Sequence, residues 1–85
     1  GSRQPDFIMN GLPWEMKSPI SNGARTIEHA VRSASKQSEN IIIDLRRSKI
    51  DDERAIAQIN FHASKRTNIR RLIVITKKGA HIEIK

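Results

Sequence analysis

The 85 residues contain no cysteine, which excludes a disulfide framework and a thiolate metal site as sources of stability for so small a domain. Sixteen Lys and Arg against nine Asp and Glu give a formal net charge of +7; residues 1–40 carry five basic and four acidic side chains (net +1) and residues 41–85 carry eleven and five (net +6). Such a basic domain is typical of proteins that bind nucleic acid, with anionic lipid the weaker alternative.

No apolar run approaches the length needed to span a bilayer, and no signal-peptide pattern occurs, so we expect a soluble domain that does not contact a membrane. Residues 1–2 (Gly-Ser) resemble the remnant of an expression tag. Residues 3–85 are therefore expected to form one domain.

The first predicted elements form a hairpin. Residues 6–9 (DFIM) and 12–17 (LPWEMK) are two short strands joined by Asn10-Gly11, a pair that suits the positive φ angles of a two-residue turn. Side chains alternate along a strand, so the Leu, Trp and Met of the second strand share one face while Glu15 and Lys17 share the other. This polar face is either an ordinary solvated face or a catalytic one.

A helix is predicted from about residue 24 to residue 36 or 37, because apolar side chains recur there at core spacing. The other side of this helix carries cationic side chains at steps of four, three and four. We call these residues the cationic helix row: Arg25, His29, Arg32 and Lys36. Rows of this kind are usually solvated, although this one matches the overall charge and is a candidate for tracking phosphates.

The run at residues 41–46 (IIIDLR) is predicted to be a central strand, since it is apolar on both faces. Asp44 and Arg46 lie on one face of it and either neutralise each other or belong to a site. A second helix is expected over residues 52–64, capped by Asp51 or Ser48.

The last part of the chain is predicted to be a basic loop around residues 65–71, a strand over residues 72–76, a turn at Lys77-Lys78-Gly79 and a closing strand over residues 81–85. The element order is then ββαβαββ. We therefore expect an α+β fold with a small mixed, largely antiparallel sheet of four to five strands and two helices.

The sequence lacks the motifs of several enzyme classes. It contains no glycine-rich phosphate loop, no zinc-ligand spacing among the three histidines and no serine elbow. Acid-base or charge-stabilised chemistry on a phosphodiester remains. Cleaving RNA requires a base for the ribose 2′-hydroxyl, an acid for the leaving oxygen and cations for the phosphorane. Glu15 or a histidine is a candidate base, Lys17 and Arg46 are candidate cations, and Thr76 is a candidate hydrogen-bond donor.

Two alternatives stay open. Asp6 followed after the hairpin by Glu15 and Lys17 fits the loose pattern of a Mg²⁺-dependent nuclease, with two carboxylates on the metal and a lysine that orients or activates water. A noncatalytic nucleic-acid-binding module is the other, although one Trp and two Phe are few for a base-stacking platform. A basic domain that binds only an acidic protein is a weaker interpretation.

Three stretches, GLPWEMKSP, SASKQSENIIIDLRRSKID and IRRLIVITKKG, together resemble the C-terminal toxin domain of CdiA proteins, the contact-dependent growth inhibition effectors, in its tRNase class. The resemblance covers roughly residues 6–85. It implies a secreted RNase that is delivered to the cytoplasm of a target bacterium, cleaves tRNA and is neutralised by a cognate immunity protein, with elongation factor Tu as a candidate host factor.

The resemblance also implies site residues by motif. It gives Glu15 and Lys17 from WEMKS, Lys36 from SASKQS, Arg46 and Arg47 from DLRRSK, and Thr76 from IVITK. Together with the residues themselves, it assigns catalysis to Glu15, Lys17, Arg46 and Thr76, assigns RNA binding to Lys36, Arg47, Lys65, Arg66 and Arg71, and assigns no metal ligand.

Many such domains share the small nuclease fold of barnase, EndoU, the tRNase colicins and RelE, which generally works without metal, and others have metal-dependent restriction-endonuclease-like folds. The hairpin that opens at Asp6 replaces the N-terminal helical portion expected of the barnase-like fold. Fold subtype and metal requirement therefore stay open.

Overall fold

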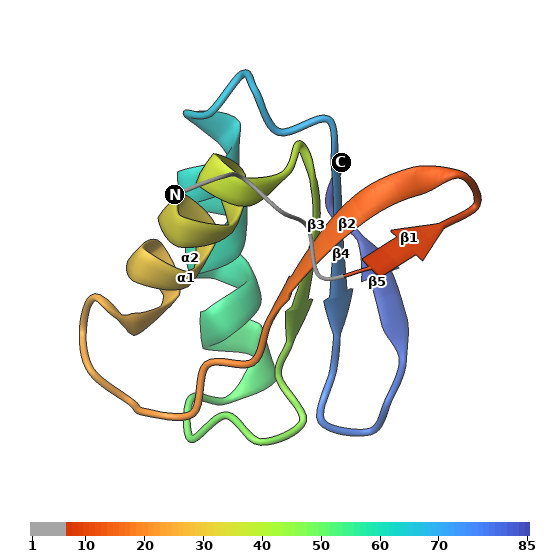
Figure 1. Ribbon diagram of the computed structural model, residues 1–85. Coiled ribbons are helices and arrows are strands. Elements are labelled where there is room, and N and C mark those ends of the chain that lie inside the picture. The colour runs from red at the N-terminus through yellow and green to blue at the C-terminus, as the bar shows by residue number, and fades with distance from the viewer. Residues whose placement is uncertain (1–6) are drawn as a thin grey trace.

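The structure, a computed structural model, describes residues 7–85 and confirms the predicted α+β class and the ββαβαββ order of elements. Figure 1 shows the helices packed on one side of a single sheet. The elements are β1 (Phe7–Met9), β2 (Leu12–Lys17), α1 (Thr26–Gln37), β3 (Asn40–Asp44), α2 (Asp52–Ser64), β4 (Arg71–Ile75) and β5 (His81–Glu83).

The five strands lie in the sheet in their chain order, and the three central strands, β2, β3 and β4, are parallel. The marginal strands β1 and β5 pair antiparallel with their neighbours. Parallel neighbours require a long crossover, and α1 and α2 supply the two crossovers. The sheet is therefore mixed as expected, but it is not largely antiparallel, because the helical crossovers make the three central strands parallel and antiparallel pairing is confined to the two margins.

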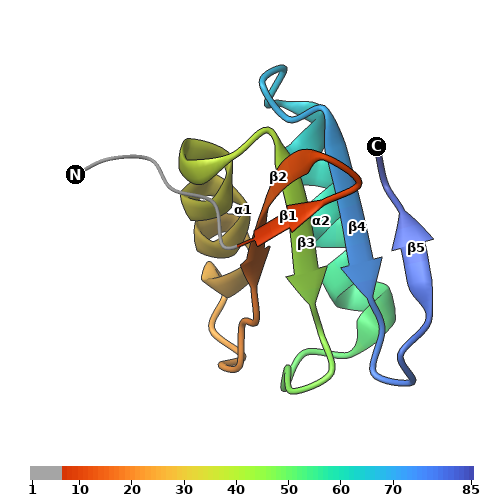
Figure 2. The ribbon, with the colours of Figure 1, turned by 45° about the vertical axis from the view of Figure 1, so that its right-hand side comes forward.

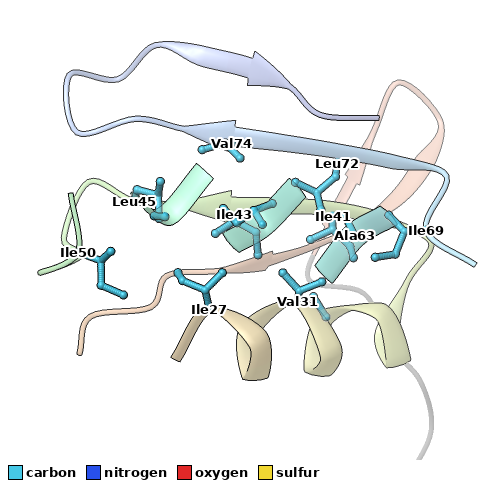
Figure 3. Close-up of a cluster of buried hydrophobic side chains, with 13 residues drawn as sticks. Ile27, Val31, Ile41, Ile43, Leu45, Ile50, Ala63, Ile69, Leu72 and Val74 are labelled. Atoms are coloured by element: carbon cyan, nitrogen blue, oxygen red, sulfur yellow. The ribbon is translucent and has the colours of Figure 1, made fainter. Parts of the chain in front are cut away.

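The main hydrophobic core lies between the helices and one face of β3 and β4 (Figure 3). Alternate residues of both strands point toward the helices, and the helices meet them with side chains at the predicted spacing. The buried members of this cluster are Ile27, Val31, Ala34, Ile41, Ile43, Leu45, Ile50, Ala55, Ile59, Ala63, Ile69, Leu72 and Val74.

The other face of the sheet, which we call the open face, has no helix over it (Figures 1 and 2). A smaller cluster of Trp14, Ile42 and Ile75 lies there, with Met9, Leu12, Met16 and Ile73 packed against it. The hairpin of β1 and β2 rises from the sheet on this side (Figures 1 and 2). Its side chains therefore cover part of the sheet surface that the helices leave bare.

The turn of this hairpin confirms the prediction for Asn10-Gly11. Asn10 has a φ of 53° and Gly11 a φ of 76°, the left-handed values that both central residues of such a turn require. The Trp14 indole N–H donates to the Met9 carbonyl at 3.3 Å, which joins the two strands of the hairpin.

The second helix spans the predicted residues, and the Asp51 side chain caps it by accepting from the backbone N–H of Arg54 at 3.1 Å. Strand β3 ends at Asp44, two residues earlier than predicted, because the Asp44 carboxylate accepts from the backbone N–H of Arg46 at 3.0 Å and turns the chain there. Neither helix within residues 7–85 is long and apolar enough to cross a membrane.

Candidate functional site

The polar residues predicted to form a site follow the parallel strands at one edge of the sheet. We call this the C-terminal edge, the edge at which β2, β3 and β4 end. The chain segments that leave these strands all lie along it in both views (Figures 1 and 2). Backbone hydrogen bonds join neighbouring segments: Lys49 N donates to Ile20 O at 3.0 Å and Leu45 N to Ile75 O at 2.8 Å. Ligands of parallel sheets typically bind beyond such an edge.

Glu15 and Lys17 lie at the end of β2. Glu15 is 4 % exposed, and its Oε2 lies 3.3 Å from the Lys17 Nζ. The second carboxylate oxygen, Oε1, is buried and has no hydrogen-bond partner among residues 7–85. Lys17 is half-buried and reaches the surface. The pair thus places one ammonium at the C-terminal edge and holds it there with a buried carboxylate.

Asp44 and Arg46 form the second acid and cation pair. The guanidinium Nη2 lies 2.8 Å from Asp44 Oδ2, and Nε lies 3.0 Å from Oδ1, so the contact is bidentate. The Arg46 hydrogen bonds hold the pKa of the Asp44 carboxyl below its usual value, although burial opposes this, and the same contact raises the pKa of Arg46. The exposed Arg46 guanidinium is therefore fixed in place at neutral pH.

Thr76 and Lys77 follow β4 at the same edge. The Thr76 Oγ accepts from the backbone N–H of Ala80 at 3.1 Å, which leaves its own proton available for donation. The Lys77 ammonium lies 3.5 Å from Asp52 Oδ1 and also donates to the Ile50 carbonyl. Lys77 is therefore committed to the start of α2, whereas the Thr76 hydroxyl, on a side chain that is 8 % exposed, has no acceptor for its proton among residues 7–85.

The structure brings the four predicted catalytic residues to one edge but not to one face. Register pairs Glu15 with Ile41 and Lys17 with Ile43, so both side chains leave the sheet on the helix side. Asp44 follows Ile42 by two residues and so shares the open face with it, and Arg46 is bonded to Asp44. Lys17 and Arg46 thus approach the C-terminal edge from opposite sides.

The burial of Glu15 differs from the expectation of an ordinary solvated face on the polar side of β2. Glu15 is covered because α1 packs across β2, and only Lys17 at the end of the strand reaches the surface. The apolar face, with Trp14 and Met16, is the one that points away from the helices. Alternation predicts which residues share a face but not which of the two faces the helix layer covers.

The sequence left open which histidine could act as a base, and the structure makes His81 a candidate. Asp44 pairs with Ile75 and Ile75 pairs with His81, so these three residues form one row across β3, β4 and β5 on the open face. His81 is exposed. Adjacent strands are about 4.8 Å apart, which places its backbone about 10 Å from that of Asp44. Only the strand register reveals this row, and no sequence pattern specifies it.

The predicted RNA-binding cations are distributed over several surfaces. Lys36 borders an open hollow of about 360 Å³ together with Ser33 and with His29 and Arg32 of the cationic helix row. Lys65 lies over the Phe61 ring at 4.1 Å, and Arg71 donates to the Asn40 side chain at 3.1 Å. Arg47 and Arg66 complete the set, and Arg47 is exposed directly beside Arg46.

The metal-dependent alternative remains a prediction. Asp6 lies outside the described residues, and residues 7–85 hold no group of three or more acidic or histidine side chains that could bind an ion.

Comparison with known proteins gave one result. The family model described as the contact-dependent growth inhibition CdiA C-terminal domain matches residues 3–80. No curated protein and no solved structure matches the chain.

Proposed function

The chain belongs to the CdiA C-terminal domain family of contact-dependent growth inhibition, as its motifs predicted, and we propose that this toxin domain is a tRNA endonuclease. The match spans nearly the whole chain, so the family assignment applies to the domain as a unit. The substrate and the reaction belong to the proposal. They rest on the charge of the domain and on the groups gathered at the C-terminal edge.

The observation that carries the proposal is the set of prepositioned cations at this edge. Lys17 is held by Glu15 at 3.3 Å and Arg46 by Asp44 at 2.8 Å, so neither cation has to be ordered when a substrate arrives. Cleavage of RNA builds negative charge on a phosphorane, and fixed cations stabilise that charge without reorganisation. An edge with two such cations and a free hydroxyl proton on Thr76 suits this reaction.

Each residue then has a role. Lys17 and Arg46 stabilise the phosphorane and Thr76 donates to one of its oxygens. Glu15 acts as a positioning residue for Lys17, because a carboxylate that is 4 % exposed is poorly placed to meet a ribose hydroxyl. His81 accepts the 2′-hydroxyl proton, since it is an exposed imidazole in the row of Asp44. The ribose oxygen attacks the adjacent phosphorus, the bond from phosphorus to the 5′-oxygen breaks, and the leaving oxygen takes up a proton from water.

The remaining cations bind the phosphates of the RNA. The cationic helix row, the exposed residues Arg47, Lys65 and Arg71, and the half-buried Arg66 supply phosphate contacts that position a substrate without reading its sequence. We expect an acidic cognate immunity protein to cover the same cations, and we expect delivery into the cytoplasm of a target bacterium. Elongation factor Tu stays a candidate host factor.

The test is incubation of the domain with total tRNA in Mg²⁺ or in excess EDTA, followed by mapping of the new ends. The proposal predicts cleavage in both buffers, with 2′,3′-cyclic phosphate ends from attack by the ribose hydroxyl. Cleavage only in Mg²⁺ would favour the metal-dependent alternative on Asp6, Glu15 and Lys17. Salt-dependent binding of tRNA without any cleavage would favour a noncatalytic module.

A further inference from the structure

A groove of about 410 Å³ lies between the tip of the β1 and β2 hairpin and the strands β4 and β5, away from the C-terminal edge. Four apolar side chains, Met9, Leu12, Trp14 and Ile73, line it. Its polar lining consists of Asn10, Arg71, Glu83 and Lys85. A concave apolar surface with a few polar groups is the usual form of a small-ligand site.

The two cations of this lining are already fixed. Arg71 uses one N–H to bond the buried Asn40 side chain at 3.1 Å, which leaves its other guanidinium donors unused. Lys85 Nζ donates to the carbonyls of Arg66 at 3.0 Å and Ile69 at 3.3 Å. Both positive charges therefore stay at the groove and attract an anionic group.

Glu83 adds a negatively charged group to the lining of the groove. It pairs with Ile73 across the strands and therefore lies on the open face beside the apolar lining. No hydrogen bond or ion pair joins its carboxylate to any described residue, although Arg71 and Lys85 line the same groove. A free carboxylate beside fixed cations calls for an occupant that carries N–H donors as well as negative charge.

The two fixed cations and the free carboxylate together indicate which class of ligand fits the groove. An acidic protein segment would satisfy Arg71 and Lys85 but would bring its carboxylates against Glu83. A nucleotide satisfies both sets of groups, because its phosphate is anionic and the edge of its base carries N–H groups. The flat apolar base also suits a lining of Met9, Leu12 and Trp14.

We propose that this groove binds one unpaired base of the RNA substrate, with Glu83 accepting from the base edge and Arg71 contacting the adjacent phosphate. This inference rests on the proposed function for the identity of the substrate. The groove lies beside Arg71 at the start of β4 and the C-terminal edge beside Ile75 at its end, about 13 Å apart along the strand. The RNA strand that leaves the groove then continues across the open face of the sheet toward the bond that is cleaved.

The carboxylate predicts a base preference. The exocyclic amino groups of cytosine and adenine, and the N–H groups of guanine, donate well to a carboxylate. Uracil offers carbonyl oxygens and one ring N–H, so its edge leaves Glu83 less well satisfied. Glu83 is therefore a specificity-determining residue that discriminates against uracil.

Trp14 makes the groove directly observable, because it is the one tryptophan of the chain. Its fluorescence is titrated with 5′-phosphorylated trinucleotides of deoxycytidine and of deoxyuridine, which lack the attacking hydroxyl and cannot be cleaved. The proposal predicts saturable quenching by both and a dissociation constant about tenfold lower for the cytidine ligand. In Glu83→Gln the two constants converge, because the amide can donate to uracil.

Glu53→Gln is the matched control, since Glu53 is an exposed carboxylate in the first turn of α2 and lies outside the groove. Glu53→Gln should still bind the deoxycytidine trinucleotide more tightly than the deoxyuridine trinucleotide. Equal binding of the two trinucleotides by the unaltered protein, or an unchanged preference in Glu83→Gln, would overturn the base site. Quenching of Trp14 by a glutamate-rich peptide and not by trinucleotides would overturn it in favour of a protein partner.

Cleavage of tRNA by the same preparations separates this inference from the proposed function. Cleavage without base discrimination refutes only the groove. Base-selective quenching without cleavage refutes only the nuclease and leaves a base-binding groove in an RNA-binding module.

Discussion

The Lys17 ammonium lies 3.3 Å from one oxygen of Glu15, while the other oxygen of that carboxylate is buried and has no partner among the described residues. Burying a carboxylate is costly unless it is paired, so Lys17 supplies most of what compensates Glu15. The two residues therefore form one unit in which the stability of β2 and the position of a cation at the C-terminal edge are linked.

A double-mutant cycle measures this link. Lys17→Met keeps the apolar stem but leaves Glu15 without its cation, whereas Lys17→Met combined with Glu15→Gln removes both charges. We expect the single Lys17 variant to be less stable than the double variant, with a coupling of about 1 kcal/mol between the two sites. Urea denaturation of the four proteins gives the value. Additive effects would show that the Glu15 carboxylate is compensated by something other than Lys17.

The Asp44 and Arg46 pair predicts a dependence of stability on pH. The folded-state pKa of Asp44 lies below its usual value of 3.8, so its contribution is fully present above that value and is lost as the pH falls through the lower folded-state pKa. The stability difference between the unaltered protein and Asp44→Asn should therefore shrink as the pH is lowered from about 5 toward 2. Denaturation curves across this range test it, and a constant difference would contradict the pairing.

Asn40 is a buried polar residue on which the hairpin side of the sheet depends. It is 1 % exposed, its amide donates to the Pro13 carbonyl at 2.9 Å and its carbonyl accepts from Arg71. Asn40→Ala should lower the free energy of unfolding by about 1 to 3 kcal/mol, because Pro13 and Arg71 lose their partner. Asn60→Ala is the matched control at an exposed position of α2, where we expect a change within about 0.5 kcal/mol. Similar losses in both variants would contradict a special role for Asn40.

Phosphate contacts by the exposed cations predict a salt dependence. If Arg47 contacts a phosphate, Arg47→Ala should lower the slope of log affinity for tRNA against log salt by about one. Arg54→Ala removes an exposed cation of α2 that we assign to no contact, and it should leave the slope unchanged. Filter-binding titrations over a range of salt concentrations provide both slopes. Equal slopes for Arg47→Ala and the unaltered protein would remove Arg47 from the interface.

Local signals were sufficient to predict most of the fold. Asn10-Gly11 specifies its turn by φ angle, Asp51 caps α2 through a side chain, and the apolar periodicity of the helices follows from burying one side. These features depend on neighbours in the chain. The parallel pairing of β2, β3 and β4 was not predicted, because a largely antiparallel sheet was expected; the helix between each two of these strands supplies the long crossover that parallel neighbours require.

The site was less predictable because it depends on which face the helices cover and on strand register. The alternation in β2 separates Glu15 and Lys17 from Trp14, but it does not reveal that α1 buries the charged side. The row from Asp44 to His81 depends on pairing of β3 with β4, which lie far apart in sequence, and the groove depends on the hairpin of β1 and β2 lying over the start of β4. No local pattern specifies such pairs.

The most direct test of the central claim is the single-turnover rate of tRNA cleavage in excess EDTA for Arg46→Ala beside its matched control Arg54→Ala. Thermal unfolding of each variant, and of the double variant Asp44→Asn with Arg46→Ala, shows whether any loss comes from unfolding. If Arg46 stabilises the phosphorane, the cleavage rate should fall by about 100-fold or more in folded Arg46→Ala and in the double variant. The cleavage rate of Arg54→Ala should be unchanged. Full activity in folded Arg46→Ala would contradict an active site at the C-terminal edge.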